Sequence, residues 1–506
     1  MNAMARLQVF VLLFSTMIPS LYAQSFEDIR IKSHDGVILD ATLYKPQMGG
    51  NEQPLPILVF ANSWTLNKKQ YHEEALVFSK KGYWVLSYST RGFGRSGGLA
   101  SAASPDDIKD VSVLLDWLEA NTNAHMERVG MAGISYGGGI SLLAAAADDR
   151  IKAVASMSGW SDLKEAFFGE GTLRISLMKI LIDTGSFMGR VDPQFKILLN
   201  DLKQNPNEDA VTQWTHIRSA SHFVDKLNEN QTAIFMSNNF KDYLFSPIQG
   251  IRLFEKLTGP KRLYMNPGIH ASAEALDIGG SKSLLWGELH SWFDFFLKNI
   301  DSGINYENTV TITGPDGSET YKTLPKGIKS VDLKPKNEVV QGQLSVDYGR
   351  FTGATTGIPL LMSAVQSHSK LPIKTWIKSI RKNYAAVYES ESIGGRQEYR
   401  GIPRLSLTAT PMAEDLHLVA YVYDVDEYGF GTLISHGVVT RHRLNPGETQ
   451  SLSFSLNPMS HDLEAGHKIS LVIDSYDPLY LRPKNGGAFT IVHDDDEKLQ
   501  LTMPHY

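Results

Sequence analysis

The chain has 506 residues, of which 42% are hydrophobic and 21% charged, and its formal net charge is -6. This length exceeds one compact core, so we expect about two to four domains. The acidic balance offers no basic field for a phosphate backbone, which argues against nucleic acid as a partner. The chain has no cysteine, so disulfides, zinc–thiolate sites, iron–sulfur sites and a cysteine nucleophile are excluded.

The first 23 residues are arranged like a secretory signal peptide. Arg6 precedes an apolar run, Leu7 to Ala23, which is broken by Pro19 and by hydroxyl side chains. The run is shorter than the roughly 20 residues that a membrane-spanning helix needs. We therefore expect export to the periplasm or the medium, a mature chain that begins near Gln24, and no membrane span in that chain.

Residues 24 to about 160 alternate between strand-like and helix-like segments. This alternation predicts a mostly parallel sheet covered by helices. The expected strands are Phe26–Lys32, Val37–Tyr44, Pro56–Phe60, Tyr83–Thr90, Val129–Gly133 and Ala153–Ser158. The expected helices are His72–Lys80, Asp106–Ala120 and Gly138–Ala147.

The next segment, from about 160 to 230, has apolar residues at helical spacing and no convincing strand. The clearest examples are Leu173–Met188 and Gln194–Leu202. A helical block inserted into a sheet domain is typical of a cap over a site. We therefore expect a helical cap here.

Sheet-like order returns after the cap. Strands are expected over Ala233–Ser237 and Lys261–Asn266, and a helix over Ser283–Lys298. With these elements the first domain, including its cap, is expected to span residues 24–300.

After a polar linker, residues 309–506 carry short alternating strands separated by Gly, Pro and Asn. This pattern predicts an all-β sandwich or jelly roll. Examples of the expected strands are Leu405–Ala409, Leu416–Tyr423 and Ile469–Ile473. The predicted fold is thus an α/β domain with an inserted helical cap, followed by an all-β domain.

The segment Gly133-Ile-Ser135-Tyr-Gly137 joins an expected strand to the helix that follows it. A serine on so sharp a turn leaves no room for side chains two residues before and after it, which explains the glycines. The Ser135 hydroxyl then projects over the sheet, and the Tyr136 backbone N–H points to where an oxyanion would form. This context predicts the nucleophile elbow of an α/β-hydrolase.

A second match to the same pattern, residues 94–98 with Ser96 at the centre, leads into a loop with no helix behind it, so we favour Ser135. The overlapping segment 92–97 fits the dinucleotide-binding pattern. That fingerprint needs a helix that opens directly on the glycines, and Pro105 with its neighbours delays the helix. We therefore expect no nicotinamide or flavin, and no other cofactor.

A serine nucleophile needs a histidine base, and the histidine needs a buried carboxylate. In α/β-hydrolases the acid and then the histidine follow the serine along the chain, at the carboxyl ends of strands. Asp242 and His270 each come just after one of the two strands expected beyond the cap. We expect Ser135, Asp242 and His270 to form a triad, with His290, inside an expected helix, as the second choice for the base.

The second oxyanion donor normally comes from the loop after the third strand, here Ala61-Asn-Ser63-Trp64. The backbone N–H groups of Ser63 and Trp64 are candidates, and so is the Trp64 indole N–H. The equal alternative is that Trp64 packs against the cap.

The acidic run His493–Glu497 is the segment most similar to a metal cluster. Consecutive acids in a β-rich segment are more often a solvated turn, so we expect no metal.

With these residues in place, the chain resembles the cocaine-esterase and Xaa-Pro dipeptidyl-peptidase family of serine hydrolases over nearly all of its expected mature length. The resemblance implies that Ser135, Asp242 and His270 form the triad, that a helical cap covers the site, and that the edge of a jelly-roll domain helps to enclose it. The matching segments are 90–98, the helix 110–118, 130–138, 259–270, 292–297, 422–426 and 465–467.

Two departures from the family pattern lie at the site. Family members often carry Pro-Tyr, whose tyrosine hydroxyl donates to the oxyanion, where this chain has Ser63-Trp64. That donor is then either the Trp64 indole or absent. The histidine loop, Pro267-Gly-Ile-His270, replaces a common Gly-Pro-Trp-x-His and alters the wall beside the base.

The sequence therefore predicts an exported serine hydrolase that forms an acyl-enzyme and acts on a small ester, an amide or a short Xaa-Pro peptide. A peptide substrate needs an anion for its free α-amine, and Glu165 and Glu170 of the cap are the candidates. Trp160, Phe167 and Phe168 would equally suit an aromatic acyl group. The alternative is a catalytically inactive hydrolase fold that binds a ligand through its β-domain.

Overall fold

A computed structural model describes residues 26–47, 53–204, 208–276, 278–279, 284–304, 308–314, 316–357, 372–493 and 499–505. The expected signal peptide, residues 1–23, lies outside the described residues. Within the described ranges, no helix combines the length and the apolarity that crossing a bilayer requires.

A ten-stranded sheet forms the centre of the first domain in the described part of the chain. Its strands are β1 (Phe26–Lys32), β2 (Ile38–Tyr44), β3 (Leu55–Ala61), β4 (Trp84–Tyr88), β5 (Ala124–Ile134), β6 (Ile151–Met157), β7 (Ala233–Lys241), β8 (Lys261–Ile269), β9 (Val310–Gly314) and β10 (Gly317–Tyr321). Their order in space is β1-β2-β4-β3-β5-β6-β7-β8-β9-β10. Neighbours from β4 to β9 run parallel, and the pairs at the two ends run antiparallel.

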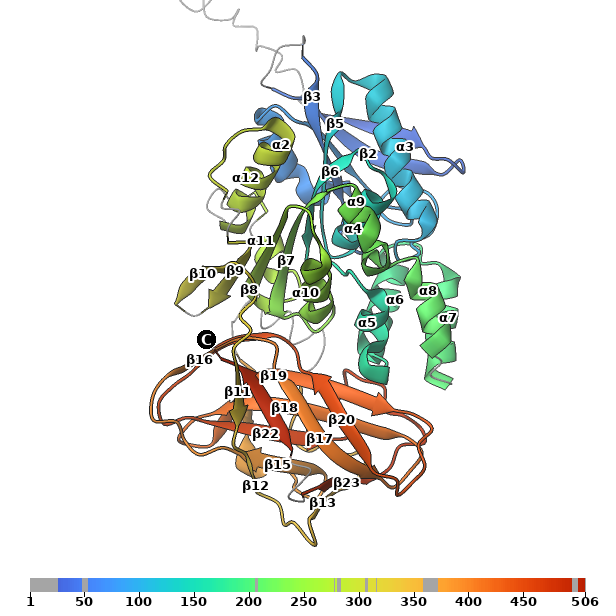
Figure 1. Ribbon diagram of the computed structural model, residues 1–506. Coiled ribbons are helices and arrows are strands. Elements are labelled where there is room, and N and C mark those ends of the chain that lie inside the picture. Colours follow the sequence, from blue (N-terminus) through green and yellow to red (C-terminus); the bar gives the residue numbers. More distant parts are fainter. Residues whose placement is uncertain are drawn as a thin grey trace, which may run out of the picture.

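Helices cover both faces of this sheet (Figure 1). They are η2 (Lys68–Tyr71), α2 (His72–Lys80), α3 (Pro105–Asn121), α4 (Tyr136–Ala147), α10 (Pro247–Lys256), α11 (Ser272–Leu276) and α12 (Leu284–Lys298). Ile57 and Val59 of β3 pack on the side of α3 and α4, whereas Leu58 and Phe60 pack on the side of α2 and α12. Burial on both faces is what a parallel sheet requires, and the expected α/β fold is confirmed.

The cap lies between β6 and β7, in the segment where the sequence predicts helices and no strand. Its elements are α5 (Leu163–Phe168), η3 (Gly169–Gly171), α6 (Ile175–Met188), α7 (Pro193–Gln204), α8 (Glu208–His216), η4 (Ala220–Phe223) and α9 (Val224–Glu229). Phe167, Phe195 and Trp214 stack in series, with ring centroids 5.8 and 5.4 Å apart. This stack joins α5, α7 and α8 into one unit.

The C-terminal domain is all β, as expected. One antiparallel sheet contains β11 (Ile328–Val331), β13 (Gln343–Val346), β17 (Arg404–Pro411), β20 (Gln450–Ser455), β23 (Phe489–Val492) and β24 (Gln500–Pro504). The other contains β12 (Lys334–Pro335), β14 (Lys374–Trp376), β15 (Ala385–Glu389), β18 (Leu416–Val425), β19 (Phe430–Arg441) and β22 (Lys468–Asp474). The short helix η5 (Ile377–Ser379) and the pair β16 (Gln397–Gly401) and β21 (Met459–Leu463) complete it. Leu407, Leu418 and Leu471 belong to the buried core of this domain.

The boundary between the domains differs from the prediction. The sequence places residues 309–506 in the β-domain, but β9 and β10 extend the first sheet, with β9 beside β8. A short alternating strand has the same local pattern in either sheet, because tertiary packing decides which edge it joins. The β-domain therefore begins after Tyr321.

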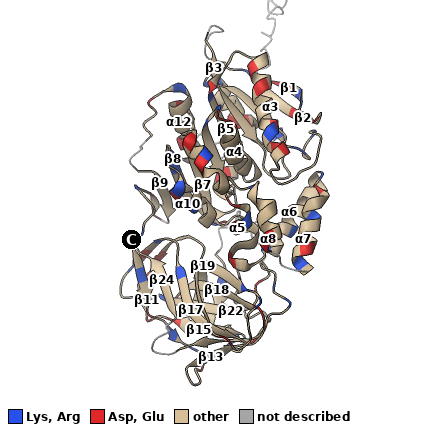
Figure 2. Ribbon diagram, turned by 45° about the vertical axis from the view of Figure 1, so that its right-hand side comes forward, with Lys and Arg blue, Asp and Glu red and all other residues tan. Residues whose placement is uncertain are grey.

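The cap contacts the β-domain directly. In Figure 1, the cap helices α5 to α8 lie between the β-domain and the sheet domain. Thr172 Oγ1 lies 2.6 Å from Thr440 Oγ1, and the Leu481 N–H donates a 2.8 Å hydrogen bond to the Leu173 carbonyl. Acidic and basic residues occur together on single helices such as α3 (Figure 2), in keeping with the small net charge of the chain.

Candidate active site

Ser135 lies on a sharp turn between β5 and α4. Its φ is 57° and its ψ is -112°, a strained conformation for a residue with a side chain. Its N–H donates a 2.7 Å hydrogen bond to the carbonyl of Met157 on β6, which fixes the turn. An added Cβ at Gly137 would lie 2.0 Å from the Ala61 carbonyl oxygen, and one at Gly133 would lie 2.3 Å from the Gly137 carbonyl carbon. The turn therefore has the tight packing that a nucleophile elbow demands.

Three side chains form a hydrogen-bonded chain at the carboxyl ends of β5, β7 and β8. His270 Nε2 lies 2.9 Å from Ser135 Oγ, and His270 Nδ1 lies 2.8 Å from Asp242 Oδ2. Asp242 is fully buried, and its Oδ1 accepts hydrogen bonds from the backbone N–H groups of Leu244 and Phe245. The structure thus brings the three predicted residues together, in a geometry in which the imidazole can take the serine proton.

The surroundings of His270 favour its protonated form. Burial lowers the pKa of this imidazole, but the charge and the hydrogen bond of Asp242, together with the charge of Glu274, outweigh burial and raise the pKa of His270 above its usual value. An imidazolium formed by proton transfer from Ser135 would therefore be stabilised by its neighbours.

Glu274 is a buried carboxyl at this site that the sequence reasoning missed. It lies on α11, four residues after the triad histidine, and its Oε1 accepts hydrogen bonds from the hydroxyls of Ser158 and Ser237 at 3.0 and 2.8 Å. Its Oε2 accepts a 2.7 Å bond from Asn239 Nδ2, and the Ala271 N–H donates to Ser158 Oγ at 3.2 Å. Burial raises the pKa of Glu274 above its usual value, and the hydrogen bonds, which lower the pKa, only partly oppose this shift. No motif marks an acid at this spacing, so only the fold reveals it.

The loop after β3 contains the residues expected to supply the second oxyanion donor. The Ser63 N–H donates to Gln70 Oε1 at 2.7 Å, and the Trp64 indole N–H donates to the Leu181 carbonyl at 2.8 Å. These two expected donors therefore already have acceptors. Their hydrogen bonds connect the loop to η2 on one side and to the cap on the other. Among the described residues, none accepts a hydrogen bond from the Trp64 backbone N–H. That N–H and the Tyr136 N–H, in the first turn of α4, remain as candidate donors.

The two alternative residues, Ser96 and His290, have partners outside the triad. Ser96 is 1% exposed, and its Oγ donates to the Ser89 carbonyl at 2.6 Å and accepts from the Asp40 N–H at 2.8 Å. His290 Nε2 lies 3.1 Å from a carboxylate oxygen of Glu74. Both side chains therefore hold neighbouring segments together.

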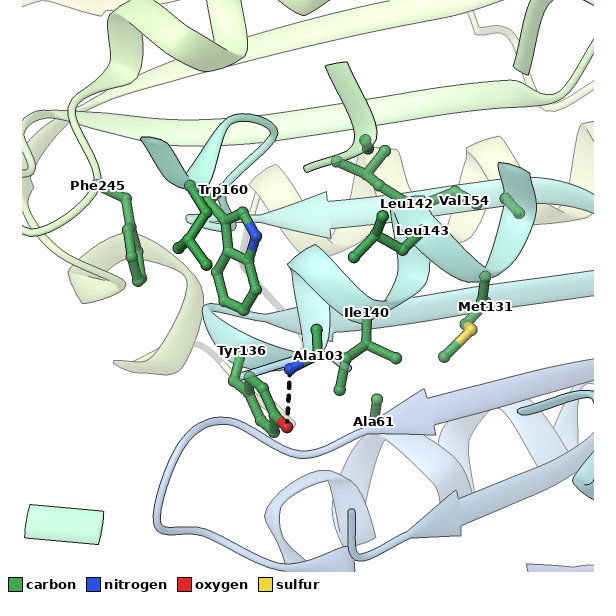
Figure 3. Close-up of a cluster of buried hydrophobic side chains, with 14 of the residues drawn as sticks. Ala61, Ala103, Met131, Tyr136, Ile140, Leu142, Leu143, Val154, Trp160 and Phe245 are labelled. Atoms are coloured by element: carbon green, nitrogen blue, oxygen red, sulfur yellow. Dashed lines mark hydrogen bonds between the residues drawn. The ribbon is translucent and has the colours of Figure 1, made fainter. Parts of the chain in front are cut away.

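A small apolar pocket adjoins Ser135. Its volume is about 10 Å³, which is room for about one water molecule. Figure 3 shows Tyr136, Trp160 and Phe245 side by side; the ring centroids of Tyr136 and Trp160 are 5.9 Å apart, and those of Trp160 and Phe245 are 5.4 Å apart. No charged side chain is among the described residues that line the pocket, which include Trp160, Leu163, Phe167, Leu181, Phe195 and Phe245.

Helical phase separates the cap residues that the sequence predicts to contact substrate. Leu163 and Phe167 are four residues apart on α5 and face the pocket beside Ser135. Glu165 and Phe168 lie on the other side of α5 and line a different cavity of about 860 Å³, between the cap and the β-domain. Of the aromatic residues predicted to contact substrate, Phe168 is therefore not at the Ser135 pocket, whereas Phe167 is.

The two acids proposed for α-amine binding also line the larger cavity. Glu165 Oε2 pairs with a guanidinium nitrogen of Arg252 at 3.1 Å, and Glu170 Oε2 lies 3.6 Å from one of Arg441. This corrects the prediction that Glu165 or Glu170 lies beside the acyl group. Both carboxylates already have counter-charges, and neither lines the pocket beside Ser135.

The acidic run His493–Glu497 lies outside the described residues except for His493, whose Nε2 is 2.9 Å from the Tyr388 hydroxyl. Within the described ranges, no group of three or more His, Asp or Glu side chains is placed to hold a metal ion.

Two family models match consecutive parts of the chain. The model of X-Pro dipeptidyl-peptidase (S15 family) matches residues 35–272, and the model of the X-Pro dipeptidyl-peptidase C-terminal non-catalytic domain matches residues 259–502. Ser135, Asp242 and His270 all lie within the first match.

Curated relatives carry related names at low identity. A protein of Streptomyces avermitilis named "Putative Xaa-Pro dipeptidyl-peptidase" is 21% identical over 419 residues, which cover 77% of this chain and 58% of the relative. A protein of Bacillus cereus with the same name is 20% identical over 452 residues, which cover 81% of this chain and 74% of the relative. The chain thus spans less than two thirds of the length of the first relative.

Solved structures share the fold over nearly the whole chain. An α-amino acid ester hydrolase superposes with a TM-score of 0.73 at 15% identity, covering 97% of this chain and 100% of the other. An aminopeptidase from a marine sediment Thaumarchaeota archaeon superposes with a TM-score of 0.71 at 14% identity, covering 95% and 97%. The similarity at these identities is one of fold, and it includes both domains.

Proposed function

Because the chain belongs to the X-Pro dipeptidyl-peptidase (S15) family, we propose that it is a serine hydrolase that cleaves ester or amide bonds through an acyl-enzyme on Ser135. The observation that carries this proposal is the hydrogen-bonded chain of Ser135, His270 and Asp242 on a strained elbow. A serine held within 2.9 Å of an imidazole, whose other nitrogen binds a buried carboxylate, has the arrangement that activates a hydroxyl.

The reaction begins with attack of Ser135 Oγ on the acyl carbon, while His270 Nε2 takes the serine proton. The oxyanion that forms accepts hydrogen bonds from the backbone N–H of Tyr136 and, as the second donor, from that of Trp64. Collapse of this intermediate breaks the bond to the leaving group, which receives the proton from His270. Water then attacks the acyl-enzyme with His270 as base, and the acid leaves as Ser135 regains its proton.

The walls of the pocket favour an ester of a short apolar acid over an Xaa-Pro peptide. The free α-amine of an Xaa-Pro peptide is charged at neutral pH. In this pocket the ammonium would lose its hydration and gain no counter-charge. Burial of such an unpaired ion costs on the order of several kcal/mol. The pocket offers aromatic walls such as Trp160, Phe167 and Phe245, and no carboxylate among its described residues. Its small volume further implies that cap side chains move aside when substrate enters.

We also propose that the protein is exported. The basic residue Arg6 followed by the apolar run Leu7 to Ala23 supports this proposal. Mass spectrometry of the protein recovered from the periplasm or medium should find a chain that begins near Gln24. A cytoplasmic protein that retains residues 1–23 would contradict it.

Labelling of the purified protein with a fluorophosphonate tests the nucleophile. We expect one adduct, on Ser135, that is lost in His270→Ala and retained in Ser96→Ala. An adduct on Ser96 would contradict the assignment. The absence of any adduct would favour the alternative of an inactive hydrolase fold that binds a ligand.

The substrate class is tested by comparing p-nitrophenyl butyrate with glycyl-prolyl p-nitroanilide. We expect the ester to react with the higher kcat/KM and Ser135→Ala to lose both activities. Faster turnover of the anilide would reverse our ranking of ester over Xaa-Pro peptide.

A further inference from the structure

In the proposed mechanism, the second oxyanion donor is the backbone N–H of Trp64. Because a peptide unit is planar, the direction of this N–H follows from the direction of the Ser63 carbonyl. That carbonyl accepts a 2.7 Å hydrogen bond from Asn62 Nδ2 and a 3.0 Å bond from the Leu66 N–H. The side chain of Asn62 therefore helps to fix where the second donor points.

Asn62 is itself held firmly. It is fully buried, and both ends of its side-chain amide are bonded to the backbone. Its Oδ1 accepts a 2.7 Å bond from the Thr90 N–H, just beyond the end of β4, and its Nδ2 donates a second bond, of 3.0 Å, to the Leu66 carbonyl. Because β4 is the neighbour of β3 in the sheet, the amide joins the loop after β3 to a rigid part of the fold.

Ser63 connects the same peptide unit to the elbow. Its Oγ donates a 3.0 Å hydrogen bond to the carbonyl of Ile134, the residue before the nucleophile, and accepts a 2.8 Å bond from Gln70 Nε2. The first oxyanion donor, the Tyr136 N–H, belongs to this elbow. The Ser63 hydroxyl therefore holds the loop at a set distance from the elbow, and with it the one donor N–H at a set distance from the other.

The loop conformation depends on these contacts. Thr65, the residue after Trp64, has a φ of 69°, which a β-branched residue seldom adopts. Such a conformation persists only where the surrounding contacts impose it. An oxyanion hole lowers the barrier because its donors are in place before the negative charge develops, and removal of one donor lowers kcat by about 10² to 10³. Contacts that hold the Trp64 peptide unit should therefore affect the rate.

We propose that Asn62 is a positioning residue for the reaction at Ser135. Its side-chain amide orients the Trp64 N–H toward the oxyanion, and the Ser63 hydroxyl holds this N–H at a set distance from that of Tyr136. This inference rests on the proposed function. Asn62 acts through a donor that binds the oxyanion, so loss of its amide should affect the transition state and leave binding of the substrate unchanged.

Ester kinetics of Asn62→Ala test the proposal, with Asn337→Ala as the matched control. The Asn337 amide makes the same set of bonds in the β-domain. Its Nδ2 donates to the carbonyls of Lys382 and Ala385, each at 2.8 Å, and its Oδ1 accepts from the Val387 N–H at 2.9 Å. Each variant removes two donated bonds and one accepted bond to the backbone, so a general loss of stability should appear in both.

We expect Asn62→Ala to lower kcat for p-nitrophenyl butyrate at least about tenfold and to change KM less than about twofold. Asn337→Ala should keep the kcat of the wild type. An unchanged kcat in Asn62→Ala, or an equal fall of kcat in Asn337→Ala, would overturn the proposal. A change confined to KM would also overturn it, because Asn62 would then act on substrate binding.

A tetrahedral inhibitor gives a second readout. n-Butylboronic acid adds to Ser135 Oγ while His270 takes the serine proton, and the adduct places an oxygen where the oxyanion forms. Its inhibition constant should rise at least about tenfold in Asn62→Ala, whereas that of the planar product butyrate should not change. Equal inhibition of Asn62→Ala and the wild type by the boronic acid would overturn the proposal.

Ser63→Ala keeps the proposal testable if Asn62→Ala fails to fold. Its control is Ser470→Ala, because Ser470 Oγ is also buried and also donates a 3.0 Å bond, to the Tyr388 carbonyl of the β-domain. Ser63→Ala should lower kcat at least about threefold, less than Asn62→Ala because the bonds to the Ser63 carbonyl remain, and Ser470→Ala should not lower it. The same kcat in Ser63→Ala and Ser470→Ala would overturn the proposal.

Failure of this inference differs from failure of the proposed function. A wild-type protein that neither hydrolyses the ester nor takes a fluorophosphonate adduct would overturn both. An active wild type whose kcat survives in Asn62→Ala and in Ser63→Ala would overturn the positioning role alone.

Discussion

The indole N–H of Trp64 donates a 2.8 Å hydrogen bond to the backbone carbonyl of Leu181. Trp64 follows β3, and Leu181 lies on the cap helix α6, so this bond joins the loop beside the nucleophile to the cap. The Trp64 ring also packs edge-on against the Tyr136 ring, with centroids 5.1 Å apart. One side chain therefore contacts the cap and the elbow, and it closes part of the pocket beside Ser135.

Replacement of this indole should loosen the cap. Trp64→Phe keeps an aromatic ring against Tyr136 and removes the donor to the Leu181 carbonyl. We expect faster amide hydrogen exchange in α6 and a loss of about 1 kcal/mol in the free energy of unfolding, the usual contribution of one hydrogen bond. Hydrogen-exchange mass spectrometry and denaturant titration measure the two effects.

Trp84→Phe is the control for this variant. The Trp84 indole N–H also donates one hydrogen bond, at 2.9 Å, but to Asn123 and not to the cap. It should therefore leave exchange in α6 as in the wild type. If Trp64→Phe also leaves α6 unchanged, the bond to Leu181 does not hold the cap.

The activity should fall as the pH is lowered through the pKa of His270. The imidazole must be neutral to accept the serine proton, and Asp242 and Glu274 raise its pKa above its usual value of about 6.5. Asp242→Asn should reduce kcat by about 10³ to 10⁴ and move the acidic limb of kcat/KM to lower pH. A pH profile of ester hydrolysis measures both, and an unmoved limb in Asp242→Asn would contradict the assignment of the limb to His270.

The same pKa shift makes His270 contribute to stability in the acidic range. A pKa that is raised in the folded protein means that folding favours the protonated imidazole, so the contribution is fully present below the unfolded pKa of about 6.5. It is lost as the pH rises through the folded pKa. His270→Gln should therefore destabilise the protein more on the acidic side of the activity limb than on the alkaline side, as measured by paired denaturant titrations. An equal loss at both pH values would contradict the shift.

Glu274 should act on the reaction through His270 as a positioning residue. Glu274→Gln keeps the shape and part of the hydrogen bonding to Ser158 and Asn239 but removes the negative charge that raises the pKa of His270. We expect the acidic limb to move to lower pH, with kcat above the limb changed by less than about tenfold. Glu288→Gln, which removes a carboxylate paired with Arg262, is the control. An unmoved limb would show that the Glu274 carboxyl is neutral in this pH range.

The sequence was sufficient for the parts of the site that depend on local pattern or chain order. Gly133 and Gly137 stand where an added Cβ would collide with neighbouring backbone atoms, so the elbow could be predicted from the two glycines around Ser135. Asp242 and His270 could be predicted because each directly follows a strand of the sheet, and the chain order of the triad is fixed in this fold.

Contacts between distant segments could not be predicted in the same way. The partner of Trp64, Leu181, is 117 residues further along the chain, and nothing near Trp64 specifies it. The phase of α5 decided that Phe167 faces the pocket and Glu165 does not, and a six-residue helix has too little periodicity to reveal its phase. The polar partners that bury Glu274 come from β7 and from the residue after β6, and so they appear only once the sheet is assembled.

The length of the acyl group should be set by the cap wall of the pocket. Leu181 lines the pocket with its side chain and accepts the Trp64 bond with its backbone, so Leu181→Ala removes three carbon atoms and keeps that bond. We expect the preference among p-nitrophenyl esters to move from butyrate toward octanoate, at a stability cost of about 2 kcal/mol. Ile197→Ala, at a cap position that is 56% exposed, should leave the preference unchanged. The same preference in Leu181→Ala and wild type would show that this wall does not limit the acyl group.

The approach of α4 to the end of β3 should tolerate no side chain at Gly137. A Cβ there would lie 2.0 Å from the Ala61 carbonyl oxygen, whereas a Cβ at Gly394 would have no atom within 4 Å. Backbone atoms cannot rotate away as a flexible side chain can, so Gly137→Ala should destabilise by about 3 kcal/mol or more, and Gly394→Ala should change stability by less than about 1 kcal/mol. Thermal melts compare the two variants, or, if Gly137→Ala does not accumulate as folded protein, their soluble yields do. If Gly137→Ala has the same melting temperature as the wild type, the close contact between the backbones of Gly137 and Ala61 does not fix Ser135 in its strained conformation. The hydrogen bond from the Ser135 N–H to the Met157 carbonyl must then do so.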